Sequence, residues 1–147
     1  MELNSSIIKK EPNDYSYEDI RVGQVVEFEK TITESLVSKF VEMTGDRNPL
    51  HTDKKYASTT QFKEKIVHGM LAASFFSTLV GMYCPGKRNL YLSQTLNFKS
   101  PLTFNKKIKI RGEIKQKIDA LKIIVMKTTL LLGNTVIIDG EAKVKLI

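Results

Sequence analysis

The chain has 147 residues, enough for one domain with its own hydrophobic core and too few for two domains of ordinary size. Apolar residues make up 41% and charged residues 27%, a balance typical of globular proteins that excludes a disordered or fibrous one. No apolar run is as long as a membrane span, and the first residues lack the pattern of a secretory signal. We therefore expect a cytoplasmic protein with no membrane contact.

The first half of the chain predicts one strand and two helices. Residues 1–14 are polar and mixed, and we expect them to form a loose N-terminal arm. Residues 22–29 alternate as expected of a strand. A helix is expected to begin after Thr33, a good N-cap, and to end at Gly45. A second, short helix is expected to begin at Asp53, whose side chain can cap its first amides.

The second half predicts a buried helix followed by strands. Residues 68–82 are apolar around nearly the whole helical circumference, which predicts a helix enclosed by other structure. Four strand patterns follow, with short turns between the last three, at residues 90–98, 107–115, 121–132 and 136–146. The expected architecture is α+β, a curled antiparallel sheet wrapped around a central buried helix. The strand at 121–132 is apolar on both faces, which favours cover by a second subunit.

Composition also limits the cofactors and partners. Cys84 is the one cysteine, so it has no intramolecular disulfide, and together with His51 and His68 it gives no zinc-ligand spacing. We expect no metal and no other cofactor, and we interpret Cys84 as a loop residue at a helix exit. The net charge of +7 suits a phosphorylated nucleotide, an acidic carrier protein or nucleic acid. Nucleic acid is not expected, because the C-terminal lysines alternate as on a solvated sheet face and no nucleic-acid motif accompanies them.

The most informative stretch, residues 44–51, reads Thr-Gly-Asp-Arg-Asn-Pro-Leu-His. It places Asp46 and His51 five residues apart across a segment built to turn. A carboxylate and an imidazole that face one pocket can share a water molecule and move its protons. An ordinary surface turn, with Asp46 capping amides and His51 solvated, is the alternative. The His68–Gly69 pair that opens the apolar segment favours the catalytic interpretation.

At these motifs the chain resembles the R-specific enoyl-CoA hydratases, also called hydratase 2 or MaoC-like dehydratases. The resemblance runs from about residue 17 to residue 147, and it is carried by four segments, at residues 45–51, 67–70, 93–101 and 140–144. It implies a single hot-dog domain over residues 1–147. It further implies a homodimer with the two sheets joined edge to edge and two active sites near the interface.

The resemblance also implies the reaction and its residues. Trans-2-enoyl-CoA and water would give an R-3-hydroxyacyl-CoA by reversible syn addition, with Asp46 and His51 as the catalytic pair. Their titrations would be coupled, which leaves the formal base open. The amide of Gly69, in the first turn of the buried helix, is expected to bind the thioester oxygen. Ser77 is expected to line the pocket or to bond a carbonyl one turn back. His68 is expected to pack and donate a hydrogen bond, or to take part in the chemistry.

Other functions stay open. A 3-hydroxyacyl-[acyl carrier protein] dehydratase runs the same reaction in reverse and would suit the basic surface. A hot-dog acyl-CoA thioesterase would release free thiol, which a hydratase would not. A non-catalytic acyl-thioester-binding subunit would have no need of both Asp46 and His51. Acyl-chain length depends on which side chains of the buried helix face the pocket, and the sequence pattern does not rank them.

Overall fold

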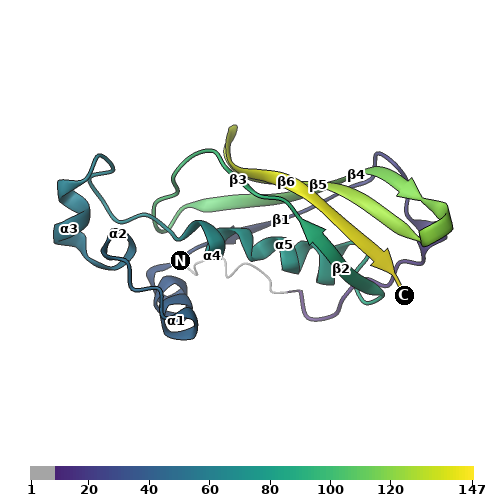
Figure 1. The fold of residues 1–147 in the computed structure, drawn as a ribbon, viewed down its shortest axis with the longest axis horizontal. Helices are drawn as coiled ribbons and strands as arrows, with labels where there is room; N and C mark the ends of the chain where they lie inside the picture. Colours follow the sequence, from purple (N-terminus) through teal and green to yellow (C-terminus); the bar gives the residue numbers. More distant parts are fainter. Residues whose placement is uncertain (1–8) are drawn as a thin grey trace, which may run out of the picture.

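A computed structural model describes residues 9–147 and shows an antiparallel sheet curled over a central helical segment (Figure 1). The helices are α1 Glu34–Thr44, α2 Pro49–Thr52, α3 Lys54–Thr59, α4 Gly69–Ala73 and α5 Phe75–Thr78, with shorter helical turns at η1 Tyr17–Asp19, η2 Leu79–Tyr83 and η3 Asp119–Leu121. The strands are β1 Val25–Thr31, β2 Asn89–Gln94, β3 Asn97–Phe98, β4 Lys107–Ile118, β5 Ile123–Leu132 and β6 Thr135–Leu146.

The sheet has the order β1-β4-β5-β6-β2, and β3 also pairs with β6. Strands β4, β5 and β6 form the predicted antiparallel meander. Lys122 and Gly133 lie in the turns between these strands with positive φ angles of 52° and 57°. Ile108, Ile110 and Ile114 of β4 are fully or almost fully buried, as their alternation predicted. The α+β class and the hot-dog arrangement of sheet and helix are therefore confirmed.

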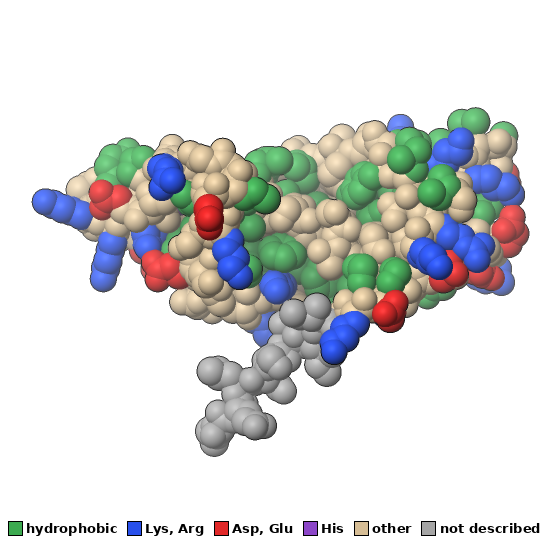
Figure 2. Space-filling model, turned by 90° about the horizontal axis from the view of Figure 1, so that it is seen from below, with side chains coloured by type: hydrophobic (Ala, Val, Ile, Leu, Met, Phe, Trp, Pro, Cys, Tyr) green, Lys and Arg blue, Asp and Glu red, His purple; other side chains and the backbone are tan. Residues whose placement is uncertain are grey.

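The central helical segment runs without a break in the chain through α4, α5 and η2 beneath the sheet (Figure 1). Its buried side chains, among them Phe76, Leu79 and Val80, pack into the core. The sequence predicts a helix enclosed by other structure. Within a single chain this holds for only one side of the segment, the side that the sheet covers. The side chains left exposed recur at helical spacing and are Met70, Ser74 and Ser77. Figure 2 views the molecule from the helix side and shows apolar side chains near the middle of this face.

Strand β2 faces the opposite way from the prediction. The apolar alternation of residues 90–98 predicts that Leu90 and Leu92 point into the core, yet they are 51% and 47% exposed, while Tyr91 packs against the core. The pairing of β2 with β6 shifts register between Tyr91 and Ser93, and β2 is the last strand of the sheet. Leu90 precedes the shift and pairs with Lys145, which is exposed, so the pairing with β6 decides which face of β2 is buried, and apolar alternation alone does not reveal it.

Strand β5 is buried on one face and partly buried on the other within one chain. Thr128 and Leu130 have no exposed surface, and Thr129 between them is 8% exposed. The side-chain amide of Gln94 donates a hydrogen bond of 2.8 Å to the hydroxyl of Thr128, on the face of β5 that also carries Met126 and Leu130. On the other face Lys127 is exposed, so cover of β5 by a second subunit stays a prediction.

The N-terminal segment is hydrogen-bonded from Asn13 onwards. The predicted loose arm covers residues 1–14, of which residues 1–8 lie outside the described part. The amide of Asn13 donates to the carbonyl of Met82 at 3.0 Å, and the carbonyl of Asn13 accepts from the amide of Lys87 at 2.8 Å. A Cβ atom at Gly86 would lie 1.9 Å from that carbonyl oxygen, so glycine lets the two segments meet. Within residues 9–147, no helix is both long and apolar enough to cross a membrane.

Candidate functional site

The site begins where α1 ends. Thr33 caps the start of this helix by accepting a hydrogen bond from the amide of Leu36. Gly45 ends it in a left-handed conformation with φ of 78°, and its amide donates to the carbonyl of Val41 at 2.8 Å. Both ends agree with the prediction. The chain reverses at this glycine, and Asp46 is the first residue after the reversal.

His51 lies on the short helix α2, which the sequence analysis interpreted only as a turn, and Asp46 lies in the turn just before this helix. The side chain of Asn48 caps α2 by accepting from the amide of Leu50 at 3.0 Å, and Pro49 occupies the first helical position. Proline is well suited there because its fixed φ is helical and its missing amide would be unpaired anyway. The amide of Asn48 donates to Oδ1 of Asp46 at 3.1 Å, so the carboxylate is oriented by the turn that carries it.

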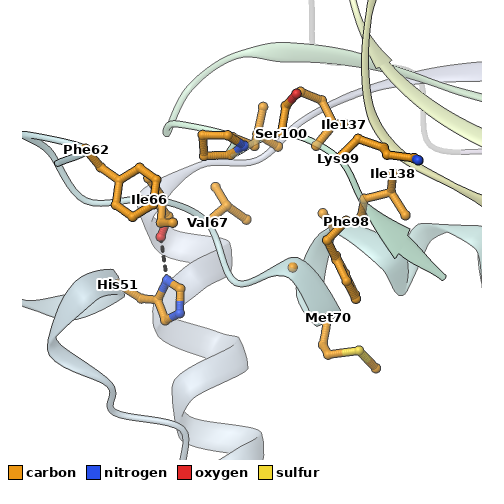
Figure 3. Close-up of a pocket in the computed structure, with 14 residues that line it drawn as sticks. His51, Phe62, Ile66, Val67, Met70, Phe98, Lys99, Ser100, Ile137 and Ile138 are labelled. Carbon is orange, nitrogen blue, oxygen red and sulfur yellow. Dashed lines mark hydrogen bonds between the residues drawn. The ribbon is translucent and has the colours of Figure 1, made fainter.

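His51 is fixed by a hydrogen bond to a distant segment. Its Nδ1 lies 2.7 Å from the carbonyl oxygen of Ile66 (Figure 3). Because a carbonyl oxygen only accepts, Nδ1 carries the hydrogen and donates it. In the neutral ring, Nε2 therefore holds the free lone pair and is the atom able to accept a proton.

His68 lies beneath this pair and is 2% exposed. Its Nε2 donates to the backbone carbonyl of Asp46 at 3.1 Å, and its ring stacks on that of His51 with 3.9 Å between centroids. Burial lowers the pKa of His68 below its usual range, although the hydrogen bond to the carbonyl of Asp46 opposes this. His68 is not one of the side chains that line the adjacent pocket.

An apolar pocket of about 470 Å³ opens beside His51 (Figure 3). The side chains of Phe62 and Ile66 lie on its His51 side, and those of Met70, Phe98 and Ile138 lie opposite. The remaining lining residues are Val67, Gly69, Ala72, Lys99, Ser100, Pro101, Leu102 and Ile137. The side chain of Lys99 extends away from His51 in this view. A pocket of this size and character suits an apolar chain that ends at a polar reacting group.

Gly69 lies at the pocket as the first residue of α4. The first amides of a helix have no partner inside it. The side chain of His68, at the N-cap of α4, accepts no hydrogen bond from these amides. A Cβ atom at Gly69 would lie 2.7 Å from Cε1 of Phe98, so the residue lets β3 approach the helix start. The amide of Gly69 is therefore free to bind an oxygen atom in the pocket.

The structure brings four of the five predicted site residues together. Polar side-chain atoms of Asp46, His51 and His68 all lie within 4.8 Å of one another, and Gly69 lies in the same pocket as His51. Ser77 is exposed and does not line this pocket. It lies eight residues beyond Gly69, roughly 12 Å along a helix.

Two aromatic residues of the pocket were not predicted as site residues. Phe98 lay within a motif that carried the resemblance, but it was interpreted only as a residue of a half-buried strand. Phe62 follows α3 in a loop, where no periodic pattern marks a side chain as inward. A Phe in an otherwise polar loop is the one signal that pointed to it.

One carboxylate and two imidazoles in such proximity also form a possible metal-ligand set. The expectation of no metal was based on the spacing of Cys84 and the two histidines, and it did not include Asp46. Nδ1 of His51 and Nε2 of His68 are already hydrogen-bonded to carbonyl oxygens. The Asp46 carboxylate, Nε2 of His51 and the buried Nδ1 of His68 are the groups left for an ion, so metal removal belongs in the functional test.

Comparisons with known proteins agree with this fold. An (R)-specific enoyl-CoA hydratase from Rhodospirillum rubrum is 37% identical over 128 residues, 87% of this chain and 89% of the relative. A mitochondrial 3-hydroxyacyl-[acyl-carrier-protein] dehydratase from Arabidopsis thaliana is 32% identical over 133 residues, 84% of this chain and 75% of the relative. The solved structure of the (R)-hydratase from Aeromonas caviae involved in PHA biosynthesis has a TM-score of 0.86 at 37% identity, with 88% of this chain and 99% of that chain covered. Residues 19–135 match the family model described as the MaoC like domain, and the chain therefore belongs to the MaoC-like domain family.

Proposed function

We propose that this protein is an R-specific enoyl-CoA hydratase, which adds water to a trans-2-enoyl-CoA to give an (R)-3-hydroxyacyl-CoA, reversibly. The observation that carries the proposal is the placement of a carboxylate, from Asp46, within 4.8 Å of the imidazole of His51, which itself lines an apolar pocket; Asp46 is not among the residues that line it. The relatives named (R)-specific enoyl-CoA hydratase, which match most of the chain, support the same activity.

The separation of the pair suits one shared water molecule. Hydrogen bonds of about 2.8 Å from one water oxygen to two acceptors allow those acceptors to be up to roughly 5.6 Å apart. The separation of at most 4.8 Å between Asp46 and His51 falls within this limit. Both groups can therefore hold the attacking water on the same side of the substrate.

The reaction then needs one proton to leave the water and one to reach the substrate. As the water oxygen bonds to C3 of the enoyl chain, one member of the pair takes the water proton, and the C2 carbon is protonated by the pair from the same face. Oxygen and hydrogen thus add syn, and the pair ends in its starting protonation state. Nε2 of His51 is suited to proton transfer because its Nδ1 is engaged by Ile66.

The thioester oxygen gains negative charge while C3 is attacked, and the amide of Gly69 is the proposed donor to it. A preorganised donor of this kind typically contributes roughly a hundredfold to a thousandfold in rate. Because α4 has only five residues, we assign the effect to the free amide itself and not to a long helix dipole.

Acyl carrier protein is the second candidate carrier of the substrate. Two plant relatives are named 3-hydroxyacyl-[acyl-carrier-protein] dehydratase, at 32% and 31% identity. The net charge of +7 would attract either an acidic carrier protein or the phosphates of coenzyme A. Comparing kcat/KM for the same acyl group on the two carriers separates them, and a strong preference for the carrier protein would replace the coenzyme A assignment.

We further infer a homodimer joined through β2. This strand is an edge of the sheet, and its Leu90 and Leu92 are about half exposed. An exposed apolar edge strand is a site where a second chain can add to a sheet. The exposed face of the central segment, with Met70, Ser74 and Ser77, offers a second surface for the same partner. Analytical ultracentrifugation tests this interface. It would be supported if the unchanged protein is a dimer and Leu92→Lys is a monomer, and it would be refuted if the unchanged protein is a monomer.

The cytoplasmic location stays a prediction.

The function is tested with Asp46→Asn, His51→Ala and a control, Glu64→Gln. Glu64 is exposed in the loop before α4, so the control removes one carboxylate charge outside the site. We expect each site variant to lose roughly a hundredfold to ten-thousandfold in kcat on a short enoyl-CoA, and the control to keep its activity. The assay follows the ultraviolet absorbance of the conjugated thioester, with chiral analysis of the product. Full activity in either site variant, an S-configured product, or loss of activity on treatment with a chelator would contradict the proposed chemistry.

A further inference from the structure

We propose that His68 is a positioning residue that fixes Asp46 and His51 relative to each other through a hydrogen bond and a ring stack, without touching the substrate. The proposal rests on the proposed function, since it concerns the same pair. It assigns a role to a buried side chain that neither lines the pocket nor caps the helix that it precedes.

The hydrogen bond ties an exposed turn to the central helical segment. Asp46 follows the end of α1, and its side chain is 50% exposed. Its amide bonds only locally, to the hydroxyl of Thr44. Its carbonyl accepts from Nε2 of His68, 22 residues further along the chain, at 3.1 Å. This contact fixes the backbone that carries the carboxylate relative to the start of α4.

The ring stack restrains the other member of the pair. The rings of His51 and His68 are 3.9 Å apart between centroids and 30° from parallel. Phe40 of α1 packs against His68 itself, with its ring centroid 4.8 Å from that of His68. His51 is also held at Nδ1 by Ile66, two residues before His68. A ring held by one hydrogen bond and one flat neighbour has little freedom to turn its Nε2 away from the water.

His68 suits this role because it stays uncharged. Its Nε2 carries the hydrogen that binds Asp46, so Nδ1 holds the lone pair, and Nδ1 is buried with no hydrogen-bond partner among residues 9–147. Protonation would leave a buried N–H donor unpaired and place a charge against the ring of His51. Asp46 and His51 are the titratable groups that face it, and burial outweighs the Asp46 contacts to lower the pKa of His68. A cation beside His51 would oppose the positive charge that His51 gains when it takes a proton.

Three substitutions separate the two contacts. In His68→Gln the amide nitrogen falls where Nε2 lies, so the donor to Asp46 is kept and the ring is lost. In His68→Phe the ring is kept and the donor is lost. In His68→Asn the shorter amide nitrogen falls where Nδ1 lies, so both contacts are lost. Asn is thus the matched control for Gln, with the same functional group placed one bond nearer the backbone.

We expect kcat for a short enoyl-CoA to fall roughly a hundredfold in His68→Asn, because displacement of a catalytic pair by about 1 Å has an effect of that size. The Gln and Phe variants are each expected to lose only about tenfold, since each keeps one contact. KM is expected to change little in all three, because His68 does not line the pocket. A folded Asn variant with wild-type kcat, or losses that fall mainly on KM, would overturn the proposal.

A measurement without substrate keeps this proposal separate from the proposed function. The chain has two histidines, so ¹⁵N NMR of the ring nitrogens assigns both once His68→Gln removes one signal set. We expect His68 to remain in the neutral Nε2–H form to a lower pH than a free histidine measured in the same buffer, because its burial lowers its pKa. Titration of His68 in the ordinary range would overturn its role even if the enzyme is an active hydratase. An inactive wild-type protein with a neutral, Nε2–H His68 would instead remove the proposed function.

Discussion

Gly69→Ala perturbs the pocket while it leaves the proposed amide donor in place. A Cβ atom at this position would lie 2.7 Å from Cε1 and 2.8 Å from Cδ1 of Phe98. Ordinary contact begins at 3.4 Å, so the edge of the Phe98 ring has to retreat by about 0.7 Å. Phe98 is 53% exposed and lines the pocket, so its ring can move, and this movement changes the shape of the pocket beside the reacting atoms.

The expected effect falls on catalysis and not on stability. Alanine in place of glycine stabilises a helix by about 0.5–1 kcal/mol, and a strained Phe98 rotamer costs about 0.5–1.5 kcal/mol, so the two nearly cancel. The melting temperature should then change by only a few degrees. A substrate displaced by a sizeable part of 1 Å is expected to lower kcat/KM by roughly tenfold to a hundredfold. That range corresponds to about 1.4–2.7 kcal/mol of transition-state stabilisation.

The assay compares four proteins on a short enoyl-CoA: wild type, Gly69→Ala, Phe98→Ala and the double variant. Removing the Phe98 ring makes room for the new Cβ atom, so the double variant should be no less active than Phe98→Ala alone. Undiminished kcat/KM in Gly69→Ala would refute the close approach of β3 to the helix start. If the double variant still lost a further tenfold or more, the loss would not come from the Phe98 contact, and the reasoning would also fail.

Three further predictions concern other parts of the molecule. Gly112→Ala should lower the free energy of unfolding in urea by about 1–3 kcal/mol, because its Cβ atom would lie 2.5 Å from Sδ of Met126 in the core. Burial and the hydrogen bond to Asp119 raise the pKa of Tyr17 from 10.0 to about 12, so the stability linked to its neutral form is complete below pH 10.0 and is lost as the pH rises towards about 12. Tyr17→Phe should therefore lose less stability over that interval, as measured by melting temperature against pH. Burial raises the pKa of the Cys84 thiol to about 12, so a thiol reagent at about pH 8 should react with it only after urea unfolds the protein.

Short-range signals account for the part of the fold that the sequence predicted well. The cap at Thr33, the stop at Gly45 and the cap at Asp53 each depend on residues within a few positions, and all three hold in the structure. The isoleucines of β4 alternate regularly, and the strand pairs over most of its length in the predicted meander. For Asp46 and His51 the sequence predicted a shared site, because five residues and one turn keep the two side chains close.

Features that depend on distant partners were not predictable in the same way. Leu90 and Leu92 alternate like core residues, but the pairing of β2 with β6 places them on the exposed face. The central segment is apolar enough to be buried all round, although residues 9–147 form only one sheet with which to cover it. For Ser77 the helical pattern gave two possible environments, and its exposure depends on which side of the segment the sheet covers. Such positions are decided by the pairing of strands far apart in the sequence.

The distinction between local and long-range contacts also explains why the segment just before α4 and at its start is important for activity, although it has few residues. The turn that carries Asp46 and His51 is locally capped and would form without it. Its placement beside the pocket depends on long-range hydrogen bonds, which run from His51 to the carbonyl of Ile66 and from His68 to the carbonyl of Asp46. The amide of Val67, between them, donates to the carbonyl of Leu102 at 2.7 Å and so ties the segment to the strand side of the pocket. Substitutions here should therefore change kcat while the helices and the sheet remain folded, because they alter where two intact structural units meet.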